Sequence, residues 1–183
     1  FKSLDFIKLS GEVLDENNNP LSNYNGELSV TIFDKNIQTQ TLRNDNYDAF
    51  PSGSTMTFTA LGEAIFRGNA SVVNGNFEFG FVVPRDIRIP IGNGRISFYT
   101  KRNQTFFDKS GYNTQIKVGG INSSAVAYNT GPTVRLYMNE ETFVNGGITN
   151  ESPFLLAKLE DENGINTASG IGYDIIGILD GDE

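Results

Sequence analysis

The sequence contains neither cysteine nor histidine in its 183 residues. Without cysteine the chain can form no disulfide and present no thiolate nucleophile. Without histidine it lacks the general base of Ser-His and Cys-His catalysis, and it cannot build a histidine-based zinc site. These two absences exclude the hydrolase mechanisms that depend on either side chain, and they leave carboxylates as candidate acid–base groups.

Tryptophan is absent as well, and basic residues are few: 14 Lys and Arg stand against 22 Asp and Glu, which gives a formal net charge of −8. Nucleic-acid binding requires clustered basic side chains, so we do not expect it here. No apolar run approaches the length that crosses a bilayer as a helix, and no signal peptide is recognisable. Hydrophobic residues make up 38% of the chain, which is ordinary for a folded globular protein.

The clearest local pattern is a hairpin around Asn74-Gly75. Apolar residues alternate with other residues on both sides of this pair, at Ala64, Phe66, Ala70 and Val72 before it and at Phe77, Phe79, Phe81 and Val83 after it. An Asn-Gly pair between two alternating runs favours a type I′ turn, because both central residues of that turn need positive φ. The pattern predicts two paired strands, with the four later residues buried and Glu78 exposed.

The same period-two alternation predicts further strands over 6–14, 28–34, 37–42, 56–60, 96–99 and 114–118. No stretch shows a convincing helical period. Some eight short strands joined by turn residues indicate an all-β fold, and we predict an immunoglobulin-like β-sandwich over residues 1–118. The Thr- and Gln-rich strand over 37–42 has little to bury, so we place it at a sheet edge.

Residues 119–132 are small and polar, which is typical of a linker. A partial second β unit is predicted over 133–183, with strands near 134–138, 155–159 and 175–179. Three strands in about fifty residues lie below the size at which a domain is comfortably stable alone. We therefore expect a truncated β domain in a piece of a longer protein. Its open edge is then covered by the first module, by later residues or by self-association through edge strands.

Acidic turns are the candidate sites for chemistry. The turns Asp15–Pro20 and Asp161–Gly164 offer hard oxygen ligands, yet neither has the spaced ligand pattern of a calcium loop, so we interpret both as tight turns. Asp180, Asp182 and Glu183 are more typical of a solvated chain end than of paired catalytic carboxylates. We predict no catalytic, cofactor-binding or metal-binding residue, and no cofactor.

Two stretches, Ile65–Ile87 and Gly131–Asp180, closely resemble the PorU family, the gingipain-like (C25) C-terminal signal peptidases of type IX secretion in Bacteroidetes. The early stretch Leu9–Val13 is in line with the same resemblance. The resemblance implies a segment C-terminal to the caspase-fold peptidase domain of a larger cell-surface protein. Catalysis in that family uses a Cys–His dyad, which implies that the dyad lies outside this chain and that no catalytic residue carries over to it.

The resemblance also implies protein partners and a location. The partners are the segment's own peptidase domain, outer-membrane components of the secretion system and secreted cargo; the location is the cell surface, on the extracellular side of the outer membrane. The function implied is a non-catalytic β-sandwich region that scaffolds the peptidase or contacts these partners.

Two other classes of function stay open. An adhesin or carbohydrate-binding module shares the sandwich fold, although the chain has no Trp and its one Phe-Phe pair is Phe106-Phe107. A hydrolase that uses carboxylates alone requires two acids facing each other across a cleft, and the sequence gives no hint of such a pair.

Overall fold

A computed structural model describes residues 1–42, 55–104, 106–125, 130–161, 164–168 and 175–178. Within these ranges every regular element is a β-strand, which confirms the predicted all-β class, and no helix there is long and apolar enough to cross a membrane. The strands are β1 (Phe6–Glu12), β2 (Gly26–Phe33), β3 (Ile37–Gln40), β4 (Thr57–Ala60), β5 (Ala64–Val73), β6 (Asn76–Val82), β7 (Gly92–Asn93), β8 (Arg95–Arg102), β9 (Asp108–Asn113), β10 (Lys117–Val118), β11 (Thr133–Met138) and β12 (Leu155–Glu160).

The predicted hairpin is present, with Asn74 and Gly75 joining β5 to β6. Their φ angles are 52° and 79°, as the predicted type I′ turn requires. The turn is also fixed from outside, because the Gly75 N–H donates to the Tyr24 carbonyl and the Gly75 carbonyl accepts from the Val13 N–H, both at 2.7 Å. A Cβ on Gly75 would overlap the carbonyl oxygen of Leu21, so the close approach of this loop also requires glycine.

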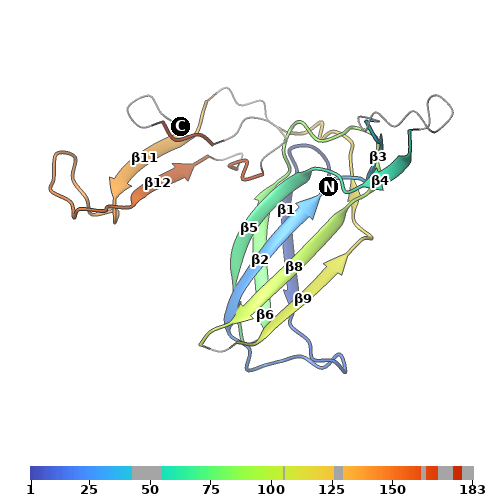
Figure 1. Cartoon of the computed structure of the whole chain (residues 1–183), viewed down its shortest axis with the longest axis horizontal. Coiled ribbons are helices and arrows are strands. Elements are labelled where there is room, and N and C mark those ends of the chain that lie inside the picture. Colours follow the sequence, from blue (N-terminus) through green and yellow to red (C-terminus); the bar gives the residue numbers. More distant parts are fainter. Residues whose placement is uncertain (43–54, 105, 126–129, 162–163, 169–174, 179–183) are drawn as a thin grey trace, which may run out of the picture. The chain divides into compact units, whose positions relative to one another are not determined.

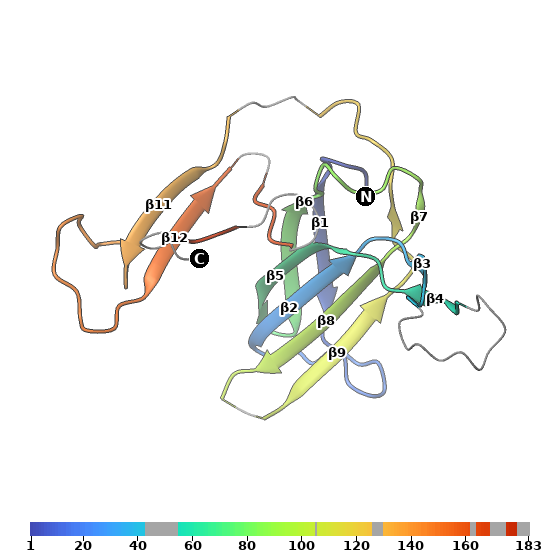
Figure 2. The ribbon, with the colours of Figure 1, turned by 45° about the horizontal axis from the view of Figure 1, so that its top comes forward.

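The two hairpin strands separate soon after the turn. β5 and β6 pair at two positions next to the turn; β6 then continues along β1, while β5 continues along β2. Phe66 of β5 and Phe81 of β6 stack with their ring centroids 4.5 Å apart, so beyond the turn the two strands face each other across the core. Figures 1 and 2 show β1 and β6 as one layer behind the layer of β5, β2 and β8.

The main sheet is antiparallel throughout, in the order β1-β6-β5-β2-β8-β9. β2 is its central strand and pairs along its full length with β5 on one side and β8 on the other. The inward residues of β2, which are Leu28, Val30 and Ile32, are at most 2% exposed. The sheet therefore curls around a core centred on β2; the immunoglobulin-like detail of the predicted sandwich stays a prediction.

Burial along β6 follows the predicted register. Phe81 and the following Val83 are buried, and Glu78 faces solvent. Phe77 and Phe79 are only half-buried, where full burial was predicted. Phe79 stacks on Phe66 at a centroid distance of 5.8 Å, which places it on the inner face near the rim of the core.

The last strand of the main sheet differs from the prediction. We predicted a strand over 114–118, but only Lys117–Val118 of that stretch is a strand, and it pairs with β7 in a separate small sheet. The main sheet instead ends in β9, whose sequence DKSGYN shows no apolar alternation. β9 forms because β8 offers it a free edge, and backbone hydrogen bonds do not depend on apolar side chains.

A buried ion pair ties together the end of the main sheet where β2 finishes. Asp34 is 2% exposed, and one of its carboxylate oxygens lies 2.5 Å from Lys35 Nζ. The other accepts the Arg88 N–H at 3.3 Å, and Lys35 Nζ also donates to the carbonyls of Arg88 and Val118. The pair therefore joins three segments that are distant in sequence. The predicted strand over 37–42 begins just beyond it, as β3 in a two-stranded sheet with β4.

The chain divides into two compact units. The first contains Phe1–Ser123 and Asn166–Glu183, and the second contains Ser124–Ile165. The second unit holds β11 and β12, which pair in register from Thr133↔Glu160 to Met138↔Leu155.

The third strand predicted for the second unit is not observed. Residues 175–178 lie in no strand, and Leu179 is outside the described residues. Residues after 165 return to the first unit, where Thr167 Oγ1 donates to the Arg67 carbonyl at 2.5 Å and Ala168 is buried. The predicted 133–183 unit is thus split between the two compact units.

Candidate functional site: a groove between two strand edges

A groove of about 590 Å³ opens between the last residues of β1 (Ser10–Glu12) and β9. These are the two outermost strands of the main sheet. The floor of the groove contains the side chains of Leu28, Phe77, Phe98 and Thr100. The Phe77 and Phe98 rings lie 5.7 Å apart between centroids, with their planes at 45°. The groove therefore has an apolar floor between polar strand edges.

Two glycines flank the phenylalanine floor. Gly11 of β1 is the cross-strand partner of Phe77, and Gly111 of β9 is the partner of Phe98. Cross-strand partners share a face of the sheet, so both glycines take inward positions next to an aromatic ring. A Cβ at position 11 would overlap the Phe77 ring, whereas a Cβ at position 111 would meet no atom within 4 Å. Gly11 therefore lets the Phe77 ring lie directly against β1, and Gly111 leaves open space beside the Phe98 ring.

Charged side chains gather at one end of the groove, where it is lined by Glu12, Asp15, Glu16 and Lys109. The Lys109 ammonium hydrogen-bonds to the Glu16 carboxylate and holds the pKa of Glu16 below its ordinary value. The pKa of Asp15 is also lowered, chiefly because its carboxylate accepts the Asn19 N–H. Three carboxylates against one ammonium make this end of the groove net negative.

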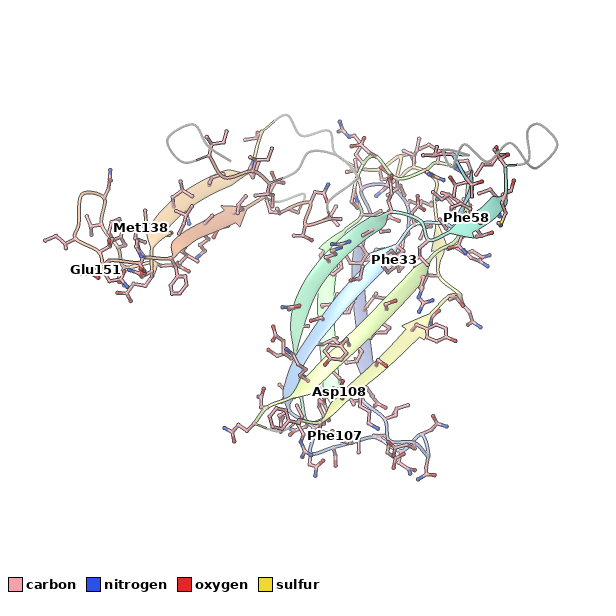
Figure 3. The ribbon with its side chains drawn as sticks, in the orientation of Figure 1. Phe33, Phe58, Phe107, Asp108, Met138 and Glu151 are labelled. Carbon is pink, nitrogen blue, oxygen red and sulfur yellow. The ribbon has the colours of Figure 1, made fainter. Side chains whose placement is uncertain are left out.

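The turn between β8 and β9 is anchored beside the groove by a buried tyrosine. Tyr24 is fully buried, and its hydroxyl lies 3.1 Å from the Thr100 carbonyl and 3.3 Å from the Phe107 carbonyl. The Arg102 guanidinium lies 5.8 Å from the centre of the Tyr24 ring. Figure 3 shows Phe107 and Asp108 where the chain enters β9. Tyr24 therefore fixes the position at which β9 starts, and with it one wall of the groove.

A smaller aromatic hollow lies on the opposite face of β8. It has a volume of about 260 Å³ and is lined by Tyr99, Lys101, Phe106, Phe107 and Asp108. A hydrogen bond to Asp108 raises the pKa of the Tyr99 phenol. Phe106 is fully exposed, so this hollow has the only Phe-Phe pair of the sequence at its edge.

Local hydrogen bonds are present in both acidic turns, Asp15–Pro20 and Asp161–Gly164. In the turn after β1, the Asp15 carboxylate accepts the N–H groups of Asn17 and Asn19 and the side-chain amide of Asn19. The Gly164 N–H donates to the Asp161 carbonyl at 3.1 Å, with residues 162–163 outside the described part. Residues 180–183, with their three acids, also lie outside it. Among the described residues, no three acids gather in a way that could hold a metal ion.

The second unit presents an apolar face. The cross-strand pairs Val134↔Leu159, Leu136↔Ala157 and Met138↔Leu155 share one face of the β11–β12 ribbon. Val134, Leu136 and Leu155 are each more than half exposed. The prediction that this unit is completed from outside itself stays a prediction.

Sequence reasoning did not find the groove. Its walls depend on β9, which has no strand-like pattern, and on the face-to-face packing of β6 against β8. The available signal was the pair of glycines at Gly11 and Gly111, because glycine inside a strand often marks the close approach of another group.

Comparison with solved structures finds the crystal structure of dimeric latent PorU from Porphyromonas gingivalis, with a TM-score of 0.66 and 30% sequence identity. The match covers 95% of this chain and 16% of the PorU chain, so the sequence corresponds to a small part of that protein's length. No protein-family model matches the sequence, and no curated protein matches it.

Proposed function

The chain is a PorU-like segment, and we propose that it is a non-catalytic accessory β region of a PorU-like C-terminal signal peptidase of the type IX secretion system. In this role it scaffolds the peptidase domain, or it contacts secreted cargo or the outer-membrane components of the secretion machinery. The single observation that carries the proposal is the match to PorU over 95% of the chain at 30% identity.

The chemistry of the chain supports an accessory role. It has no Cys and no His, so a Cys–His peptidase dyad belongs to another part of the parent protein. The groove and the β11–β12 ribbon offer apolar surface of the kind that contacts proteins. We place the region at the cell surface, on the extracellular side of the outer membrane, together with the parent peptidase.

Calorimetric titration of the purified chain tests the accessory role. The chain is titrated with the separately purified peptidase domain of its parent and with a secreted substrate that carries the C-terminal signal. We expect saturable binding to at least one of them, and heat-unfolded chain serves as the control. Binding to neither protein would contradict the scaffolding and cargo-binding roles and would leave only contact with the outer-membrane components.

A carbohydrate-binding module is the second candidate, and the aromatic hollow on β8 favours it. Tyr99, Phe106 and Phe107 supply ring faces there, and Lys101 and Asp108 supply polar groups. A glycan-array measurement tests this candidate: selective binding that Phe106→Ala abolishes would support it. Equal binding by the wild type and Phe106→Ala would exclude the hollow as the site.

A further inference from the structure

We propose that the groove between β1 and β9 binds an extended polypeptide strand with apolar side chains at alternate positions and a basic residue beside them. The inference deepens the proposed function and rests on it for the source of the strand, a protein partner of the PorU-like peptidase. The binding itself is argued from the groove alone.

Both walls of the groove are strand edges. In the described part of the chain, β1 pairs with β6 alone and β9 pairs with β8 alone. The outward N–H and C=O groups of an edge strand form a template on which another strand can pair. Strand addition to such an edge is a common mode of peptide recognition, in which the backbone supplies affinity and alternate side chains supply specificity.

The floor of the groove accepts the side chains of such a strand. The space over Gly111, beside the Phe98 ring, is free of other atoms to at least 4 Å from a Cβ position, and Gly11 lets the Phe77 ring lie against β1. A groove of about 590 Å³ is within the usual range of ligand sites. The two rings are inclined at 45°, so they form an apolar hollow for aliphatic side chains and no flat platform for a sugar.

Charge selects among apolar strands. Glu12, Asp15 and Glu16 outnumber Lys109 at one end of the groove. An inward charge on an edge strand discourages indiscriminate pairing, and Lys109 is held at that end by Glu16. A strand with a basic residue at this end adds an attractive partner for the carboxylates, and an acidic strand meets repulsion.

The test uses the purified chain and a synthetic fluorescein-labelled peptide of alternating Val and Thr with Lys at both ends. Fluorescence anisotropy measures its binding to the wild type and to Gly111→Val. Valine fills the open space over Gly111, and a β-branched residue suits a strand, so the variant should fold normally. Gly131→Val is the matched control, because a Cβ there also meets no atom and Gly131 lies outside the groove. Circular dichroism confirms that both variants are folded.

We expect the wild type and Gly131→Val to bind the peptide equally. Gly111→Val should bind it at least about tenfold more weakly, because its valine occupies the space of one buried side chain of the peptide. Replacing alternate residues of the peptide by proline removes backbone donors and should weaken binding as strongly. Exchanging its Lys for Glu should weaken it as well.

The inference would be overturned by no binding of the Lys-flanked peptide, by equal binding of its proline or Glu counterpart, or by unchanged binding to folded Gly111→Val. A wild-type dimer in sedimentation that Gly111→Val dissolves would also overturn it, since the groove would then belong to a second copy. Each result is independent of the calorimetric test of the accessory role, so failure of one leaves the other standing.

Discussion

Phe77 of β6 and Phe98 of β8 pack with ring centroids 5.7 Å apart, although β5 and β2 lie between their strands in the sheet order. Such a contact is possible only because the sheet curls until its two ends approach each other. The same curl places the β1 and β9 edges on either side of the groove. The core and the candidate binding site are therefore two results of one bend. It begins where β5 and β6 separate, beyond the Val72↔Phe77 pair.

Truncating Phe81, in the aromatic core, should strongly lower the stability of the protein. Phe81→Ala removes a 6%-exposed ring that packs on Phe66 and lies edge-on to Phe1, so we expect a loss of about 3–5 kcal/mol in the free energy of unfolding. Glu78→Ala removes an exposed carboxylate and its surface ion pair with Lys8 on the neighbouring strand, so it should cost no more than about 1 kcal/mol. Urea denaturation of both variants measures this difference. A Phe81→Ala protein as stable as Glu78→Ala would show that the register of β6 is wrong.

The Tyr24 hydroxyl should have a measurable and local effect. Tyr24→Phe keeps the buried ring but removes the donor to the carbonyls of Thr100 and Phe107, and we expect a loss of about 1–2 kcal/mol. Amide hydrogen exchange should show faster opening around Phe107 than in β2. Uniform loss of protection across the main sheet would mean that Tyr24 does not anchor the β8–β9 turn specifically.

The buried ion pair should be costly to break. Asp34→Ala leaves the mostly buried Lys35 ammonium without its carboxylate and leaves the Arg88 N–H without an acceptor, so we expect a loss of about 3–5 kcal/mol in the free energy of unfolding. Asp86→Ala changes an exposed carboxylate in the neighbouring loop and is the matched control. Thermal unfolding followed by circular dichroism compares the two. Equal melting temperatures would contradict the structural role of Asp34.

Acid should loosen the turn after β1 in a defined pH window. Hydrogen bonds from Asn19 hold the folded pKa of Asp15 below its ordinary value of 3.8. The resulting stabilisation is fully present above 3.8 and is lost as the pH falls through the lower folded pKa. An NMR titration of the Asn19 amide should therefore have its midpoint below 3.8. A midpoint at or above that value would show that the turn does not form as described.

The part of the fold that could be predicted from sequence is the part with strong local signals. The turn at Asn74-Gly75 and the inner face of β6 were predicted correctly, from the Asn-Gly pair and from the alternating phenylalanines. The predictions failed where long-range pairing decides the structure. Asp108–Asn113 is a strand only because β8 lies beside it, and residues 175–178 have the apolar composition of a strand but lie in none.

The candidate site could not be predicted for the same reason. Gly11 and Gly111 are 100 positions apart, and the sequence does not reveal that they flank the same two rings. What sequence could establish was the absence of Cys–His and Ser–His chemistry, together with the resemblance to PorU that the structural match supports.

Mass spectrometry of a substrate that carries the C-terminal signal tests the central claim of a non-catalytic accessory region most directly. The substrate is incubated with the purified chain alone and, in parallel, with its intact parent protein. The account predicts that the chain leaves the substrate at its full mass while the parent removes the signal. Removal of the signal by the chain alone, in a preparation free of other proteases, would contradict the account.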